Sequence, residues 1–158
     1  MQVTIFSLFI SSFFLLNANN LLATDLPKVF LLGEHEKEYE QLVMDYNANL
    51  LAACDNDMQG AFKKWVSMLK EMEEYAKNME YDINGVKFWI HVFWDKNGEI
   101  KHLAYHLRPN SRSIETEELS NFLQSFINQY RFPLTTTKKF SHYSTAYFPM
   151  TTQRMQKN

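Results

Sequence analysis

The amino-acid sequence predicts an α+β fold, in which an N-terminal helical hairpin precedes a β-β-α-β unit with a small antiparallel sheet. Two observations predict it. Apolar residues recur every three or four positions between Tyr39 and Met79, and the pattern changes to alternate positions from Val86 to Trp94. The charge changes at the same place, because residues 25–84 contain 13 acidic and 6 basic residues whereas residues 85–158 contain 5 and 10. We therefore expect an acidic helical half (25–84) and a basic α+β half.

The composition is that of a globular protein with a substantial core. The chain has 158 residues, of which 46% are hydrophobic and 15% aromatic, and this argues against disorder. The net charge of −2 argues against a generic nucleic-acid binder. The lone cysteine, Cys54, excludes an intramolecular disulfide and a cysteine-based zinc site.

The N-terminal segment predicts export. No charged residue occurs before position 25, and the run Val3–Leu16 is mostly apolar. As a helix this run would span about 21 Å, less than the hydrocarbon core of roughly 30 Å. It therefore predicts a signal peptide at residues 1–23, cleaved near Ala18 or Ala23, and a periplasmic or secreted protein with no stable membrane insertion after cleavage. A buried helix or an uncleaved anchor is the alternative, because no basic residue precedes the run.

Two helices are expected in the acidic half. The apolar stripe of the first helix is Tyr39, Leu42, Val43, Tyr46, Leu50 and Cys54. The stripe of the second is Met58, Phe62, Trp65, Val66, Leu69, Met72, Ala76 and Met79. Asp55-Asn56-Asp57 between them offers N-cap residues. Because this turn is short, the sequence predicts an antiparallel helical hairpin in which the methionines fill the core.

The basic half begins with a predicted β-hairpin. Residues 86–94 alternate between apolar and polar or aromatic positions, which is typical of a strand. The tetrapeptide Asp95-Lys96-Asn97-Gly98 predicts a turn whose glycine supplies a positive φ. The second strand is expected at residues 99–107. Its apolar positions change parity between Ile100 and Leu103, so a β-bulge is expected there.

A helix and a last strand follow. Thr116 is expected to cap a helix with the apolar stripe Leu119, Phe122, Leu123, Phe126, Ile127 and Tyr130. Pro133 ends this helix. Residues 138–150 predict the last strand, and residues 151–158 predict a polar, frayed tail.

Several motifs of the basic half occur in a recognisable order. They are Gly85-Val86 opening a strand, the turn Asp95 to Gly98 followed by Ile100, a helix, the exit Tyr130-Arg131-Phe132-Pro133, and a final strand with Phe140 and Phe148. In this order residues 85–150 resemble the C-terminal domain of TonB-like proteins. Energy transducers of that family have a membrane anchor and a long spacer, and the acidic half occupies the place of the spacer.

The resemblance implies a function in binding rather than catalysis. Domains of this family bind short segments of outer-membrane receptors by adding strands. A freestanding exported protein is therefore expected, which contacts an envelope protein or peptide and is linked to outer-membrane transport, with no cofactor. The last strand would be the pairing edge, and the candidate residues are Phe140, His142, Ser144, Ala146 and Phe148.

Other uses of that edge strand remain open. Arg131, Lys138 and Lys139 lie near it in the sequence and would favour an acidic partner. Lysines at an edge equally prevent unwanted pairing. A homodimer formed through the edge is a further alternative.

Three histidines form the alternative candidate site. His91, His102 and His106 are expected on one face of the β-hairpin, where they could bind zinc or copper as a metal-binding protein or metalloenzyme. The competing interpretation is an aromatic patch, with Trp89 and Phe93 on the same face, that the N-terminal helices cover.

A hydrolase is not expected. Ser141 and His142 are adjacent in a predicted strand and would point to opposite faces, so they cannot act as nucleophile and base.

Overall fold

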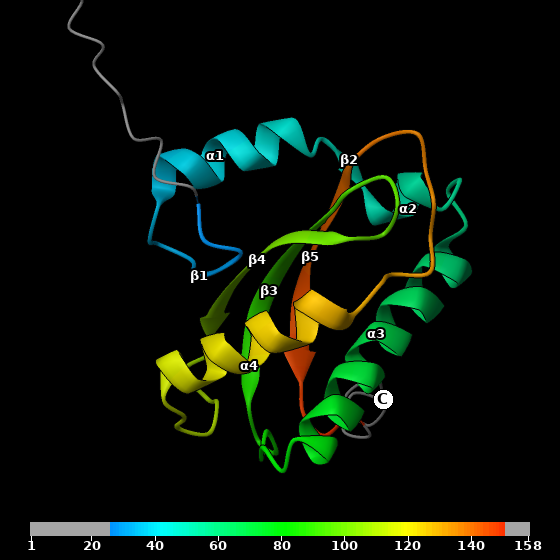
Figure 1. Cartoon of the computed structure of the whole chain (residues 1–158). Helices are drawn as coiled ribbons and strands as arrows, with labels where there is room; N and C mark the ends of the chain where they lie inside the picture. The colour runs from blue at the N-terminus through cyan, green and yellow to red at the C-terminus, as the bar shows by residue number, and fades with distance from the viewer. Residues whose placement is uncertain (1–25, 151–158) are drawn as a thin grey trace, which may run out of the picture.

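The computed structural model describes residues 26–150, so the predicted signal peptide and the polar tail lie outside the described residues. The elements in chain order are β1 (Val29–Leu31), α1 (Glu36–Asp45), β2 (Ala48–Asn49), α2 (Leu50–Ala53), α3 (Met58–Asn78), β3 (Lys87–Trp94), β4 (Ile100–Leu107), α4 (Thr116–Gln129) and β5 (Phe140–Tyr147) (Figure 1). This mixture of helices and strands confirms the α+β class. Within residues 26–150 no helix is long and apolar enough to cross a membrane.

The strands form one five-stranded sheet in the order β1-β4-β3-β5-β2. β3 is antiparallel to both β4 and β5, whereas β1 is parallel to β4 and β2 is parallel to β5. The sheet is therefore mixed, and it differs from the small antiparallel sheet that was expected. The acidic half of the chain supplies both outer strands, which are too short to show an alternating pattern in the sequence.

The predicted β-hairpin is confirmed in detail. Phe93 lies opposite His102 but Trp94 lies opposite Ile100, so Lys101 is the extra residue of a bulge. This bulge restores the apolar face of β4 after the turn. Gly98 has a φ of 79°, and a Cβ there would lie 2.1 Å from the carbonyl oxygen of Phe132.

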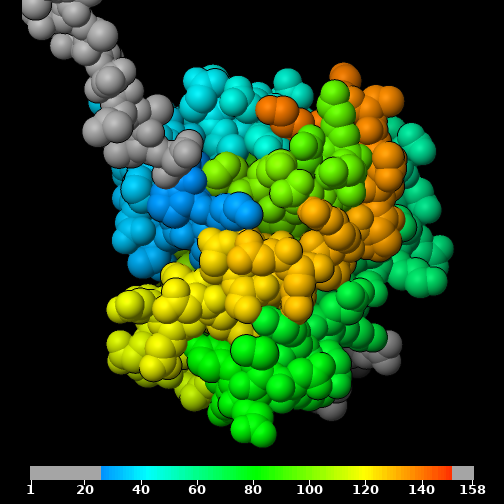
Figure 2. Space-filling model, viewed as in Figure 1, coloured from blue at the N-terminus to red at the C-terminus, as the bar shows by residue number. Residues whose placement is uncertain are grey.

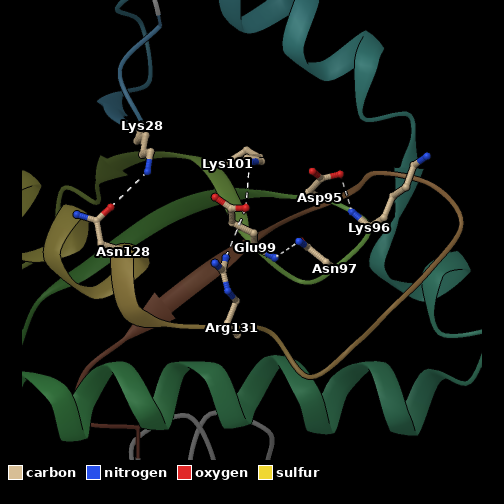
Figure 3. Close-up of polar contacts among 8 residues, drawn as sticks. All are labelled: Lys28, Asp95, Lys96, Asn97, Glu99, Lys101, Asn128 and Arg131. Carbon is tan, nitrogen blue, oxygen red and sulfur yellow. Dashed lines mark hydrogen bonds and ion pairs between the residues drawn. The ribbon is translucent and has the colours of Figure 1, made fainter.

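Charged side chains connect this hairpin to the segment after α4. Figure 3 shows Glu99 between two cations: its carboxylate lies 3.0 Å from Lys101 Nζ and 3.6 Å from Arg131 Nη1. Glu99 and Arg131 also form an isolated backbone bridge. The two ion pairs hold the Glu99 pKa below its usual range, with the Lys101 hydrogen bond as the largest cause. The turn and the helix exit are thus fixed against each other.

Helices α3 and α4 cover one face of the sheet, where the main core lies. Trp65 and Leu69 of α3 and Phe126 of α4 are buried in one apolar cluster with Ile90 and Trp94 of β3. The two helices lie side by side in the space-filling view (Figure 2). The predicted apolar stripe of α4 is confirmed, since its five apolar positions from Leu119 to Ile127 are all buried. Thr116, however, is the first residue of α4, and Glu115 precedes it as N-cap without a side-chain bond.

Helix α1 covers part of the opposite face. Leu42 of α1 and Tyr46 beyond it pack on Phe93 and Ala104, in a second and smaller apolar cluster with Phe30 of β1. This is the aromatic patch that competed with the metal site as an interpretation of this face.

The acidic half does not form the expected helical hairpin. α1 ends at Asp45, β2 follows, and the Asn49 side chain accepts a hydrogen bond from the Ala52 N–H at the start of α2. The first predicted helix is therefore broken into α1 and α2, and α1 lies across the sheet from α3. The reason is local: Asn47 and Asn49 favour caps and turns over a helix interior. The predicted N-cap before α3 is confirmed, because Asp57 accepts from the Gly60 N–H.

Candidate functional site

The candidate site is the outer edge of β5. The neighbouring strand β2 pairs with β5 at only two positions, Ala48 with Phe140 and Asn49 with Ser141. Within residues 26–150 no strand pairs with β5 beyond Ser141 on this side. The part of β5 that follows Ser141 is therefore an unpaired sheet edge.

The register shows which backbone groups this edge presents. The Phe148 N–H donates to the Val86 carbonyl, and the Phe148 carbonyl accepts from the Gly85 N–H, so both groups of Phe148 face β3. Backbone groups of an antiparallel strand alternate between its two sides. Tyr147, Thr145 and Tyr143 therefore direct their N–H and C=O groups away from β3, toward the unpaired side.

A groove runs beside this edge, between β5 and the helices α2 and α3. Its volume is about 570 Å³, and its lining is mostly apolar. Met58 and Phe62 of α3 line it and are 70% and 60% exposed. Leu50 and Leu51 of α2 line its other end. The site thus consists of unpaired backbone groups and an adjacent apolar groove.

An aromatic pair forms part of this groove. The rings of Trp65 and His142 meet edge to face with centroids 4.6 Å apart. Burial lowers the pKa of His142, so its ring is neutral at pH 7. A neutral imidazole against an indole keeps the groove suited to apolar side chains.

The five predicted edge residues divide into two groups. The side chains of His142 and Ser144 line the groove. Phe140, Ala146 and Phe148 are buried in the main core, and Phe140 stacks on Trp94. A partner would therefore meet the side chains of two of the five.

The sequence interpretation missed the other components of the site. The sequence pattern places Met58 and Phe62 in the buried stripe of α3, but both lie in its first two turns and are exposed. Tyr143, Thr145 and Tyr147 have the outward backbone groups, and this parity follows only from the register with β3. The exposed position of Tyr143, at 53%, had no signal in the sequence.

The three candidate metal ligands lie on one sheet face, as expected. Their partners differ: His91 Nδ1 shares a 2.9 Å hydrogen bond with the Tyr39 hydroxyl, His102 Nδ1 lies 3.1 Å from the Pro27 carbonyl oxygen, and His106 stacks on Trp89. Among residues 26–150 no three histidine, cysteine or acidic side chains are close enough to hold a metal ion together. The geometry therefore gives the metal hypothesis no support.

Comparisons with known proteins do not assign the chain to a family. No family model matches the chain, and neither a curated protein nor a solved structure matches it. The functional argument consequently depends on the edge of β5 and its groove.

Proposed function

We propose that this protein is an exported binding protein that holds an extended segment of an envelope protein by strand addition to β5. The observation that carries the proposal is the unpaired edge beyond Ser141, which lies next to an apolar groove. An added strand would satisfy the outward backbone groups of Tyr143, Thr145 and Tyr147. Neither feature requires a catalytic step, and the proposal includes none.

The groove supplies selectivity in this proposal. Side chains of an added strand point alternately to the two faces of the sheet. His142 and Ser144 lie on the same face as α3, so every second side chain of the added strand would enter the groove beside Phe62. Burying the exposed surfaces of Met58 and Phe62 would stabilise the complex by the hydrophobic effect.

The resemblance of residues 85–150 to the TonB C-terminal domain favours the same mode of binding. It also suggests the partner class, a segment of an outer-membrane protein. The proposed connection with energy transduction or transport is supported by this resemblance alone.

Site-directed photo-crosslinking in the native cell tests the proposal. A photoreactive residue at Met58, on the groove rim, should capture a defined envelope protein, and the crosslinked peptide should be an extended segment. The same residue at Lys70, an exposed position on α3 outside the groove, is the control and should capture nothing in common with it. The Thr145→Pro substitution removes an outward N–H and should abolish capture at Met58. Capture that survives this substitution would exclude strand addition.

A further inference from the structure

The sheet face that α1 covers in part has an uncovered end next to the candidate site. α1 packs over Phe93 and Ala104, and the strand residues in the rows beyond them are half-buried or exposed. In these rows Lys87 lies opposite Tyr147, and Trp89 lies between His106 and Thr145. The open end thus carries aromatic and basic side chains on three adjacent strands.

Arg108 is held in place at this end. Its guanidinium carbon lies 5.4 Å from the ring centroid of Trp89 and 5.1 Å from that of Tyr147. Two cation–π contacts fix the guanidinium plane, and so less side-chain entropy is lost when it binds a ligand. The Arg108 Nε is buried and has no hydrogen-bond partner within the described residues.

The charge at this end has no counter-charge on the sheet. The residues that β3, β4 and β5 place on this face include no aspartate or glutamate; they are Lys87, Trp89, His91, Phe93, His102, Ala104, His106, Ser141, Tyr143, Thr145 and Tyr147. No ion pair links Arg108 or Lys87 to a carboxylate among residues 26–150. A positive charge with fixed geometry and no internal partner is suited to an external anion.

The position of the charge relates it to the strand-addition site. Arg108 follows β4, but its guanidinium extends over Tyr147, which belongs to β5 itself. A strand added to β5 would lie about 4.8 Å farther out. Its side chains on this face would therefore project beside Tyr147, within reach of the guanidinium for a long acidic side chain.

We propose that Arg108, fixed between Trp89 and Tyr147, recognises a carboxylate of the bound segment. This inference rests on the proposed strand addition to β5. It specifies the partner: an extended segment in which apolar residues, directed into the groove, alternate with acidic residues on the Arg108 side. Arg108 is then a specificity-determining residue, whereas the backbone edge and the groove provide the binding itself.

Binding of matched peptides to the purified protein tests the inference. The probes are capped peptides in which valine alternates with glutamate, and counterparts in which valine alternates with glutamine; fluorescence anisotropy gives their Kd values. The glutamate peptide should bind about tenfold more tightly than the glutamine peptide, as expected for a charge-assisted hydrogen bond. Arg108→Gln should remove this preference and leave the Kd of the glutamine peptide unchanged.

Two further variants separate recognition from folding and from net charge. Arg108→Lys keeps the charge but loses the planar fork, so it should retain only part of the preference. Lys70→Gln removes one positive charge from an exposed position on α3 outside the groove and should leave the preference intact. Near-ultraviolet circular dichroism of each variant checks that the aromatic core is preserved.

The outcomes distinguish the two proposals. Equal binding of both peptides to the wild type, unaffected by Arg108→Gln, would overturn the role of Arg108 and leave strand addition standing. Failure of both peptides to bind would overturn strand addition and this inference with it. Loss of the preference in Lys70→Gln as well would show that net charge, and not the Arg108 geometry, attracts the acidic peptide.

Discussion

His91 of β3 is a buried histidine. It is 7% exposed, and its ring contacts Tyr39 and Phe93. Burial, with a smaller effect of the nearby His142 imidazole, lowers the pKa of His91 to about 4. The neutral ring is therefore part of the core between α1 and β3.

This lowered pKa predicts a loss of stability in acid. The unfolded chain takes up a proton on this histidine near pH 6.5, whereas the folded chain does so only near pH 4. The stabilisation of the folded state that arises from this pKa difference is complete above pH 6.5. It is lost as the pH falls to about 4, and its total is about 3 kcal/mol. Urea unfolding at a series of pH values measures it. His91→Gln should flatten this part of the profile. Identical profiles for wild type and His91→Gln would contradict the account.

Gly98 offers a second test at the residue scale. Its φ is 79°, and an added Cβ would lie 2.1 Å from a backbone oxygen that has little room to move. Gly98→Ala should therefore destabilise the protein by about 2 kcal/mol or more. Gly33 has a φ of 98° with nothing within 4 Å of an added Cβ, so Gly33→Ala should cost only about 1 kcal/mol of backbone strain. Equal free energies of unfolding for the two variants would contradict the close approach at Gly98.

At the scale of the element, the two sides of β5 differ. One side is paired with β3 along its whole length, and the other is paired with β2 at two residues. Outward and inward backbone groups alternate along the strand, so neighbouring residues should respond differently to the same substitution.

Proline substitution tests this alternation. Thr145→Pro removes an outward N–H and should change the free energy of unfolding by less than about 1 kcal/mol. Ser144→Pro removes an N–H that faces β3 and should cost about 3 kcal/mol or more. Thermal unfolding measures both. A greater loss of stability in Thr145→Pro than in Ser144→Pro would show that the register is reversed.

Elements with a long, regular pattern could be predicted from the sequence. The stripe of α4, the alternation of β3 and the parity change in β4 each specify a buried face, and the structure confirms them. β1 and β2 have three and two residues and hence no measurable period. Their pairing depends on tertiary contacts with β4 and β5. Because β2 has no pattern of its own, the sequence indicated one continuous helix where the chain forms α1, β2 and α2.

The candidate site was predictable only where a local sequence pattern specifies it. The last strand was identified, and His142 and Ser144 do line the groove. Which backbone groups are unpaired depends on the register with β3, and which apolar residues of α3 are exposed depends on how the helix packs against the sheet. Both are properties of the assembled molecule rather than of a local pattern.

At the scale of the whole molecule, the two halves of the chain share one core. Trp65, Met68, Leu69 and Met72 of α3 are buried in the same cluster as the residues of β3 and α4. The fragment 85–158 should therefore fail to fold cooperatively, because it lacks this helix and both outer strands. Circular dichroism with a urea titration checks this. A sigmoidal transition of the fragment would contradict the shared core and support a separate C-terminal domain.

The central claim is that the outer edge of β5 receives an extended segment. Amide hydrogen exchange of the protein, with and without the peptide in which valine alternates with glutamate, tests it most directly. Without peptide, the amides of Tyr143, Thr145 and Tyr147 should exchange rapidly, and those of Ser144 and Ala146 slowly. With peptide, the three outward amides should become protected while the inward pair stays unchanged. Protection that appears elsewhere, or at none of the three, would contradict strand addition at β5.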